Sequence, residues 1–277
     1  MDIKTLDELK AQKQAGKLEN VTQGNNIAVQ IAAQNGNLEL VKWLILESGQ
    51  PVDATVANNA AVRWAAKNGH LDVVRWLVKE SGQAVDVTDL DNYALRASAQ
   101  NGHLDVVRWL VKESGQAVDV TSVNNSAVCW AATNGHLDVV RWLVLESGQP
   151  VDVTANNNVC LQHAAKNGHL DLLKWIFSDL DVAPKIEMRL LIGCAVEKEQ
   201  IETIKWIVES SGYLVDCRNC NAWKTPVSFR NWPEKIQEYF LHIKMIQDSV
   251  GLDNWVECLD QIRKSEMAPP VGSKLRV

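Results

Sequence analysis

The sequence predicts an all-α solenoid of stacked helix-turn-helix units with projecting fingers and helical caps. Residues 68–88 and 101–121 are the same 21 amino acids, NGHLDVVRWLVKESGQAVDVT, displaced by 33 positions. An Asn-Gly pair and a tryptophan recur at the same interval, at Asn35, Asn68, Asn101, Asn134 and Asn167 and at Trp43, Trp76, Trp109, Trp142 and Trp175. A fixed period of this length is typical of repeat proteins, in which each unit buries its apolar face against its neighbours.

One repeat illustrates how the sequence specifies each element. Asn58-Asn59 is expected to cap a short helix, Ala60–Lys67, which ends at Asn68-Gly69 because glycine accepts the left-handed conformation. A second helix, Leu71–Glu80, places aliphatic residues on one broad arc and charged residues opposite. Ser81-Gly82 ends that helix, and the Val-Asp-Val-Thr stretch that follows is expected to form an extended finger.

This unit, with NGHLDVVRWL beside its interhelical turn, resembles the ankyrin repeat over about residues 21–241. The family's Thr-Pro-Leu-His opening of the first helix is replaced, for example by Ala60-Ala61-Val62-Arg63, and Thr225-Pro226-Val227-Ser228 is a single near match. The predicted organisation is a capping half-repeat (1–20), five regular repeats (21–183), two degenerate repeats (184–248), a C-terminal capping helix (249–266, with its helix at about Leu252–Lys264) and a flexible tail (267–277).

Charge and hydropathy argue against nucleic-acid and membrane partners. The formal net charge is −6, the isoelectric point is about 5.6, and Lys and Arg are interleaved with Asp and Glu. This leaves no basic surface for a phosphate backbone. No stretch approaches the roughly 20 apolar residues that span a bilayer, and the charged N-terminus MDIKTLDELK lacks a secretory apolar region. A cytoplasmic location follows as a prediction.

The cysteines are expected to be reduced and structural. There are six, and most stand where neighbouring repeats carry Ala or another small or apolar residue: Cys129, Cys160, Cys194, Cys217, Cys220 and Cys258. Cys217-x-x-Cys220 could instead form half of a zinc site, but no second such pair or closely spaced His pair accompanies it. We therefore expect neither a metal nor another cofactor.

Two recurring side chains have both a structural and a functional interpretation. The tryptophans lie at the rim of the apolar arc, so they either pack between repeats or form an aromatic docking strip. The histidine column consists of His70, His103, His136 and His169. Repeats about 8–10 Å apart cannot bring these rings to one zinc ion, which needs ligands at about 2.0–2.1 Å. We therefore expect them to stabilise turns through hydrogen bonds, as the equivalent histidine does in the ankyrin family.

No pattern points to an enzyme. The chain has no Gly-rich phosphate loop and no G-x-S-x-G nucleophile motif. Its carboxylate and histidine pairs recur at equivalent places in every unit, as a framework does and a unique active site does not. A non-catalytic protein is predicted.

The two near-identical repeats indicate where recognition lies. Outside the copied block, Asp89–Gln100 and Ser122–Thr133 differ at nine positions, all in the fingertip or the first helix. The ankyrin resemblance places partner recognition on the concave face made by these segments. Candidate partner-binding residues are Arg63, Trp64, Asp89, Leu90, Tyr93, Arg96, Ser122, Val123, Ser126, Trp130, Gln162 and His163. A duplication boundary at Thr88/Thr121 would explain the pattern equally well, and Trp64 and Trp130 could be exposed or buried.

Two function classes follow. The first is a monomeric module that recruits or blocks a protein partner through its concave face. The second is a structural or oligomerisation scaffold that uses a Trp-rimmed convex face. The Trp-containing motif also resembles ankyrin repeats of amoebae, giant viruses and intracellular bacteria, which implies an effector secreted into a host cytosol as one context.

Overall fold

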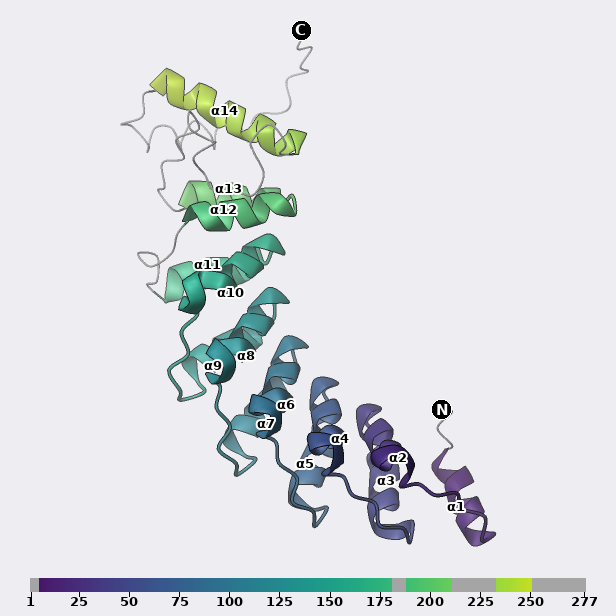
Figure 1. Ribbon diagram of the computed structural model, residues 1–277. Coiled ribbons are helices and arrows are strands. Elements are labelled where there is room, and N and C mark those ends of the chain that lie inside the picture. Colours follow the sequence, from purple (N-terminus) through teal and green to yellow (C-terminus); the bar gives the residue numbers. More distant parts are fainter. Residues whose placement is uncertain (1–4, 181–187, 211–232, 251–277) are drawn as a thin grey trace. The chain divides into compact units, whose positions relative to one another are not determined.

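The computed structural model describes residues 5–180, 188–210 and 233–250, whose regular elements are all helical (Figure 1). The chain divides into two compact units, Met1–Cys160 and Leu161–Val277. The first unit contains α1 (Leu6–Gln14), α2 (Gln23–Gln34), α3 (Leu38–Lys42), the π-helical η1 (Trp43–Glu47), α4 (Val56–Lys67), α5 (Leu71–Lys79), α6 (Asp89–Gln100), α7 (Leu104–Lys112), α8 (Ser122–Thr133) and α9 (Leu137–Leu145). The unit boundary falls within α10 (Ala155–Lys166), and the second unit continues with α11 (Leu170–Asp179), α12 (Met188–Glu197), α13 (Ile201–Ser210) and α14 (Glu234–Val250).

In the first unit the helices form pairs that stack in chain order. The first helices of neighbouring repeats, α2, α4, α6 and α8, pack against one another, and each also packs on its own second helix (Figure 1). The loops that follow the second helices extend away from the helix pairs (Figure 1). The all-α repeat architecture predicted from the 33-residue period is therefore confirmed.

The segment predicted to be a capping half-repeat contains a single helix, α1. Thr5 and Glu8 form a capping box, in which the Thr5 hydroxyl accepts from the Glu8 amide and the Glu8 carboxylate accepts from the Thr5 amide. This arrangement satisfies free donors at the helix start. The Lys13 ammonium donates to the Glu47 carbonyl, which ties α1 to the first complete repeat.

In the second unit, α12 and α13 form a further helix pair, and α14 begins inside the segment predicted to hold two degenerate repeats (184–248). Several predicted features lie outside the described residues: the Thr225-Pro226 motif, Cys217, Cys220, Cys258, the capping helix at 252–264 and the tail at 267–277.

The tryptophans of the second helices belong to the core. Trp43, Trp76, Trp109, Trp142 and Trp175 are each at most 6% exposed. Around Trp76, the side chains of Val73, Val74 and Leu77 are fully buried, and small alanines in the first helices allow close approach. The packing interpretation is confirmed for these five rings, and the aromatic docking strip is wrong for them.

Each regular first helix begins with a left-handed turn, which sequence reasoning did not predict. In α4 the residues Ala57, Asn58 and Asn59 have φ of 54°, 57° and 56°, and regular helix follows from Ala60. The expectation that Asn58-Asn59 caps the helix is wrong for Asn59. Its side-chain oxygen instead accepts from the Asp86 amide of the next finger at 3.0 Å. Asparagine suits this turn because it tolerates the left-handed conformation better than other non-glycine residues.

A glutamine in each finger binds the backbone of the preceding finger. The Gln116 amide donates to the Val85 carbonyl at 2.8 Å and accepts from the Val87 amide at 2.9 Å. Gln50, Gln83 and Gln149 make the same pair of bonds one repeat apart. The fingers are therefore joined by side chains, and each buried backbone group finds its partner in the neighbouring repeat.

The histidine column also joins repeats. Nε2 of His70, His103 and His136 lies 3.0 Å from a carbonyl oxygen of the preceding first helix. Because a carbonyl only accepts, Nε2 carries the proton. A Cβ at Gly69 or at Gly102 would collide with the histidine ring of the next repeat, so these glycines are required for contact as well as for their positive φ. The predicted hydrogen-bonding role is confirmed for these three histidines.

Replacing Trp109 by Ala is expected to lower the free energy of unfolding by about 3–5 kcal/mol, the usual cost of removing a buried aromatic side chain. Trp109 is 3% exposed, whereas Leu145 on α9 is 58% exposed. The control is Leu145→Lys, because the equivalent residue one repeat earlier is Lys112. This change should alter the free energy of unfolding by no more than about 0.5 kcal/mol. Urea unfolding measures both, and equal effects of the two substitutions would contradict the packing assignment.

Replacing Gln116 by Leu keeps most of the side-chain volume but removes both bonds to the preceding finger. We expect a loss of about 1–3 kcal/mol because two partly buried backbone groups lose their partners. Gln100→Leu serves as a control on the same scaffold. Amide hydrogen exchange provides a local readout, since the Val87 amide should exchange faster in the Gln116 variant alone. Unchanged protection of Val87 would argue against the role of Gln116.

Candidate functional site

The candidate residues of the first unit lie on its fingertips and first helices. In α4 the residues between the buried alanines, Arg63, Trp64 and Lys67, are partly exposed and follow one helical stripe. At the equivalent positions of α6 and α8, Arg96, Trp130 and Thr133 are at least partly exposed, whereas Ala97 is buried. The left-handed turns lie at the start of these helices. The structure thus brings together Arg63, Trp64, Asp89, Leu90, Tyr93, Arg96, Ser122, Val123 and Trp130 on successive repeats.

Two guanidinium groups lie close to the Tyr93 ring. The Arg63 guanidinium carbon is 5.1 Å from the Tyr93 ring centroid, and that of Arg96 is 5.7 Å away. Arg63 also donates to the Asn58 and Ala57 carbonyls of its own left-handed turn. Cation–π attraction and these bonds hold the cluster in one arrangement. It presents a preorganised aromatic and cationic surface at the second and third repeats.

Side-chain bonds join neighbouring fingertips. The Asn59 amide donates to the Asp89 carboxylate at 3.0 Å, and the Ser122 hydroxyl donates to the Asp91 carbonyl at 3.1 Å. Asp89 and Ser122 therefore help to fix the tips as well as being candidate contact residues. A partner would meet a surface whose backbone is already ordered, which lowers the entropic cost of binding.

The apolar residues available to a partner are few. Leu90, Val123 and Trp130 are 42%, 51% and 44% exposed, whereas Trp64 is partly buried beneath the Lys67 ammonium, 5.0 Å from its ring. Of the two first-helix tryptophans, Trp130 is therefore exposed and Trp64 is only partly exposed. Ser126 is only 9% exposed, so little of its side chain is available to a partner, and its place among the contact residues stays a prediction.

Two further candidates belong to the second unit. Gln162 and His163 follow one another in α10, where His163 is exposed and Gln162 is partly exposed. The Cys194 thiol donates to the Gln162 side-chain oxygen, with 3.8 Å between sulfur and oxygen. The structure supports an accessible surface for His163 and gives Gln162 a partner within its own unit.

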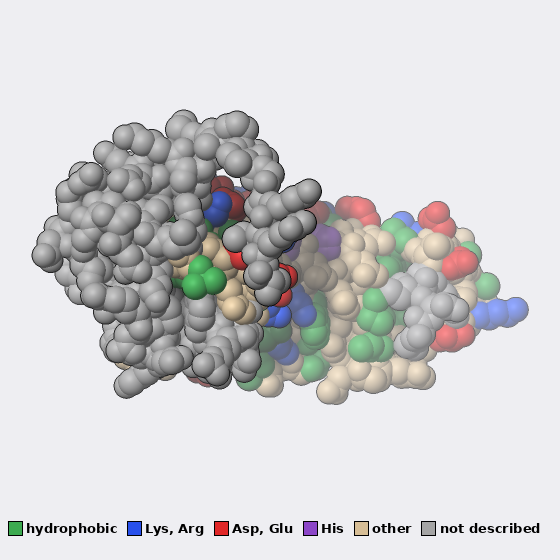
Figure 2. All heavy atoms as spheres, turned by 90° about the horizontal axis from the view of Figure 1, so that it is seen from above, with side chains coloured by type: hydrophobic (Ala, Val, Ile, Leu, Met, Phe, Trp, Pro, Cys, Tyr) green, Lys and Arg blue, Asp and Glu red, His purple; other side chains and the backbone are tan. Residues whose placement is uncertain are grey.

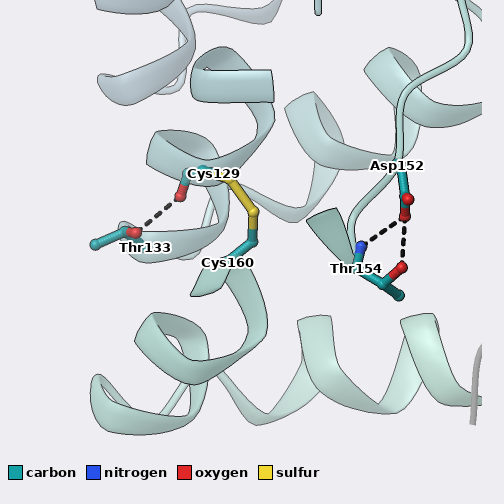
Figure 3. Close-up of a disulfide and its surroundings, with 5 residues drawn as sticks. All are labelled: Cys129, Thr133, Asp152, Thr154 and Cys160. Atoms are coloured by element: carbon teal, nitrogen blue, oxygen red, sulfur yellow. Dashed lines mark hydrogen bonds between the residues drawn. A yellow bond between two sulfur atoms is a disulfide. The ribbon is translucent and has the colours of Figure 1, made fainter. Parts of the chain in front are cut away.

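Cys129 in α8 and Cys160 in α10 form a disulfide (Figure 3). The expectation that all cysteines are reduced is therefore wrong for this pair. The two Cα atoms lie 4.5 Å apart, within the range of disulfide bridges. The pair is 31 residues apart and so breaks the 33-residue register, which is why the period alone does not reveal the contact.

Cys194 shares a small cluster with Glu197 and Lys166. Burial raises the pKa of the Cys194 thiol, the Glu197 carboxylate raises it further, and the Lys166 ammonium opposes both. A thiol kept protonated is a poor nucleophile. Lys166 bonds to Glu197, and this hydrogen bond raises the pKa of the ammonium. The cluster is a structural ion pair beside a protonated thiol.

Within the described segments, no three His, Cys, Asp or Glu side chains are grouped so that they could hold a metal ion. Across the same segments, no helix combines the length and apolar character needed to cross a bilayer. On the described part of the face in Figure 2, basic side chains stand beside acidic ones without forming a continuous field.

Sequence reasoning missed the left-handed turns and the contacts they create. A signal was present, since an asparagine recurs at 33-residue spacing at the last position of each turn, at Asn26, Asn59, Asn92, Asn125 and Asn158. The interpretation of these asparagines as helix caps predicted the start of the regular helix correctly, but their side chains do not cap it. Asn26, Asn59 and Asn92 each accept from the backbone of the next finger instead.

The family model of ankyrin repeats (3 copies) matches residues 2–89, 64–157 and 95–186. Helix pairs stacked at 33-residue intervals, each followed by a finger, agree with this match. The chain belongs to the ankyrin-repeat family. Ankyrin repeats are in general protein–protein interaction modules, and the family is in general non-catalytic. A comparison with curated proteins finds no match.

Reduction of the Cys129–Cys160 bridge is expected to lower the stability of the first unit. Closing a loop of 31 residues stabilises a fold by about 3–4 kcal/mol through the entropy of the unfolded chain. Thermal unfolding with and without reductant measures the shift, and Cys129→Ala should abolish the dependence on reductant. Alkylation of the unreduced, denatured protein followed by peptide mapping provides a direct check. Labelling of both cysteines there would contradict the bridge.

Proposed function

We propose that this protein recruits or blocks a protein partner through the fingertips and exposed first-helix stripe of its second to fourth repeats. The contact residues are Arg63, Trp64, Leu90, Tyr93, Arg96, Val123 and Trp130, with Asp89 and Ser122 holding the tips in place. Gln162 and His163 are proposed as further contacts in the second unit. A host-directed, secreted context stays a prediction from the resemblance, and a cytoplasmic location stays a prediction from the charge and hydropathy of the chain.

The single observation that supports this proposal most is the exposure of Trp130. Its ring is 44% exposed, and the equivalent residue one repeat earlier is the buried Ala97. The fold therefore accepts an alanine at this position, so packing does not require the indole. Tryptophan, tyrosine and arginine are the residue types that contribute most to binding at protein interfaces.

The identities between the third and fourth repeats also support it. Within the variable 12 residues, the shared positions are Asn92/Asn125, Ala94/Ala127 and Ala99/Ala132. Asn92 bonds to the next finger, and the alanines are buried. The identical positions thus serve the stack, and the exposed positions differ, although the buried pairs Leu95/Val128 and Ser98/Ala131 differ as well. A duplication boundary at Thr88/Thr121 stays the alternative explanation of the pattern.

The observation that first suggested a structural or oligomerisation scaffold no longer supports it. It relied on tryptophans rimming the face of the second helices, and the five rings of that column are buried. Leu46 and Leu145 remain exposed on η1 and α9, three repeats apart, with the more polar Lys79 and Lys112 at the equivalent positions between them. We therefore retain partner binding as the proposed function.

The double variant Tyr93→Ser/Trp130→Ala is expected to lose a partner that the wild-type chain captures from a cell extract. Both new residues occur at the equivalent position of a neighbouring repeat, Ser126 and Ala97, so the fold should tolerate them. The captured protein is then purified, and its affinity is measured by calorimetry. A decrease of at least about tenfold is expected for loss of two central aromatic contacts.

The matched control is Leu46→Lys/Leu145→Lys, which alters the second-helix side alone. It should retain the partner with unchanged affinity. Light scattering of the wild-type protein should report a monomer. Equal affinity of the wild type and the Tyr93/Trp130 variant, with circular dichroism showing a folded protein, would rule out the proposed surface. Loss of binding in the Leu46/Leu145 control alone would favour the scaffold instead.

A further inference from the structure

Leu90 and Val123 form a small apolar patch at the tips of neighbouring fingers. They hold the same position one repeat apart and are 42% and 51% exposed. The Ser122 hydroxyl donates to the Asp91 carbonyl at 3.1 Å. Because Ser122 precedes Val123 and Asp91 follows Leu90, this bond holds the two tips side by side.

The fold does not require large apolar residues at these positions. Leu90 and Val123 both have φ of 51°, in the left-handed region that a branched side chain disfavours. The other repeats build the same turn with Gly24, Ala57 and Asn156. The patch is therefore both exposed and conformationally unfavourable, and such a combination is typical of residues retained for binding.

The surroundings of the patch are acidic. The fingers at 48–59, 81–92, 114–125 and 147–158 contain no Lys or Arg, and their charged residues are Asp53, Asp86, Asp89, Asp91, Asp119 and Asp152. Asp86, Asp91 and Asp119 are exposed. Arg96 reaches the same turn, but its guanidinium donates to the Leu90 and Asp91 carbonyls and lies over Tyr93. Asp86 and Asp119 each accept from Thr88 or Thr121 through one carboxylate oxygen, Oδ1, and both side chains are exposed.

We propose that the Leu90–Val123 tips bind an extended partner segment in which an aliphatic side chain is flanked by Lys or Arg. This rests on the proposed function and names the chemistry of its partner. The aliphatic side chain is buried against Leu90 and Val123, and the basic side chains pair with the surrounding carboxylates.

Spacing also favours an extended basic segment. Asp86 and Asp119 hold equivalent positions one repeat apart. Neighbouring helices pack about 8–10 Å apart, and an extended chain advances about 3.3 Å per residue. Basic residues three positions apart therefore match carboxylates on successive fingers, with the aliphatic residue between them.

A random dodecapeptide library displayed on phage tests this with the full chain as bait. We expect enrichment of peptides in which Leu, Ile or Val is flanked by Lys or Arg about three positions apart. A synthetic copy of the most enriched peptide should bind with a Kd that rises at least about fivefold when sodium chloride is raised from about 50 to 300 mM, since salt screens exposed charge pairs. Fluorescence anisotropy measures the affinity.

The decisive variant is Leu90→Asn/Val123→Asn. Asparagine is the natural residue at the equivalent position of a later repeat, Asn156. The peptide should bind it at least about tenfold more weakly, while the thermal midpoint stays at or above that of the wild type because Asn accepts the left-handed turn. Leu90→Ala, which copies the residue of Ala57, provides a second substitution should the double variant not fold. Leu46→Asn/Leu145→Asn is the matched control and should leave binding unchanged.

Selected peptides without Lys or Arg, unchanged binding to the Leu90/Val123 variant, or a library that yields no binder would each overturn this inference. The proposed function is judged separately. If binding of the selected peptides is lost in Tyr93→Ser/Trp130→Ala but kept in Leu90→Asn/Val123→Asn, the first-helix surface stands and the fingertip inference fails.

Discussion

Every repeat relies on its neighbours to bury the apolar face of its second helix. A single helix pair of this length cannot cover side chains such as Val73, Val74 and Leu77, which are fully buried in the stack. Burial of Trp76 and Trp109 follows from the same requirement. The second helices of adjacent repeats contact one another, so a change in one copy affects its neighbours. This constraint agrees with the position of the second helix, wholly inside the copied 21-residue block.

Hydrogen bonds between repeats convert this packing into a defined position for the fingers. His103 reaches back to the preceding first helix, Gln116 reaches back to the preceding finger, and Asn92 reaches forward to the next one. These scaffold bonds set the position of the fingers, and bonds of Asp89 and Ser122 add links between neighbouring tips. As a result, residues such as Leu90 and Val123 are free to vary while their backbone keeps one conformation.

Much of the scaffold was predictable because it depends on periodicity and on local chemistry. The Asn-Gly and Ser-Gly pairs marked helix ends correctly, and the apolar arc of Leu71–Glu80 identified the buried face. Exposure of Trp130 and burial of Ser126 were not predictable, since both depend on the size of the residues packed beside them. The left-handed turns and the Cys129–Cys160 bridge likewise arise from contacts between repeats, which a single repeat does not reveal.

The central claim is that the copied block is scaffold and the variable 12 residues carry recognition. The most direct test is a chimaera in which residues 89–100 are replaced by the sequence of 122–133, with thermal unfolding and affinity for the captured partner measured on the same sample. We predict a folded protein with cooperative unfolding close to that of the wild type and an affinity reduced at least about tenfold. A folded chimaera that binds the partner as tightly as the wild type would contradict the account.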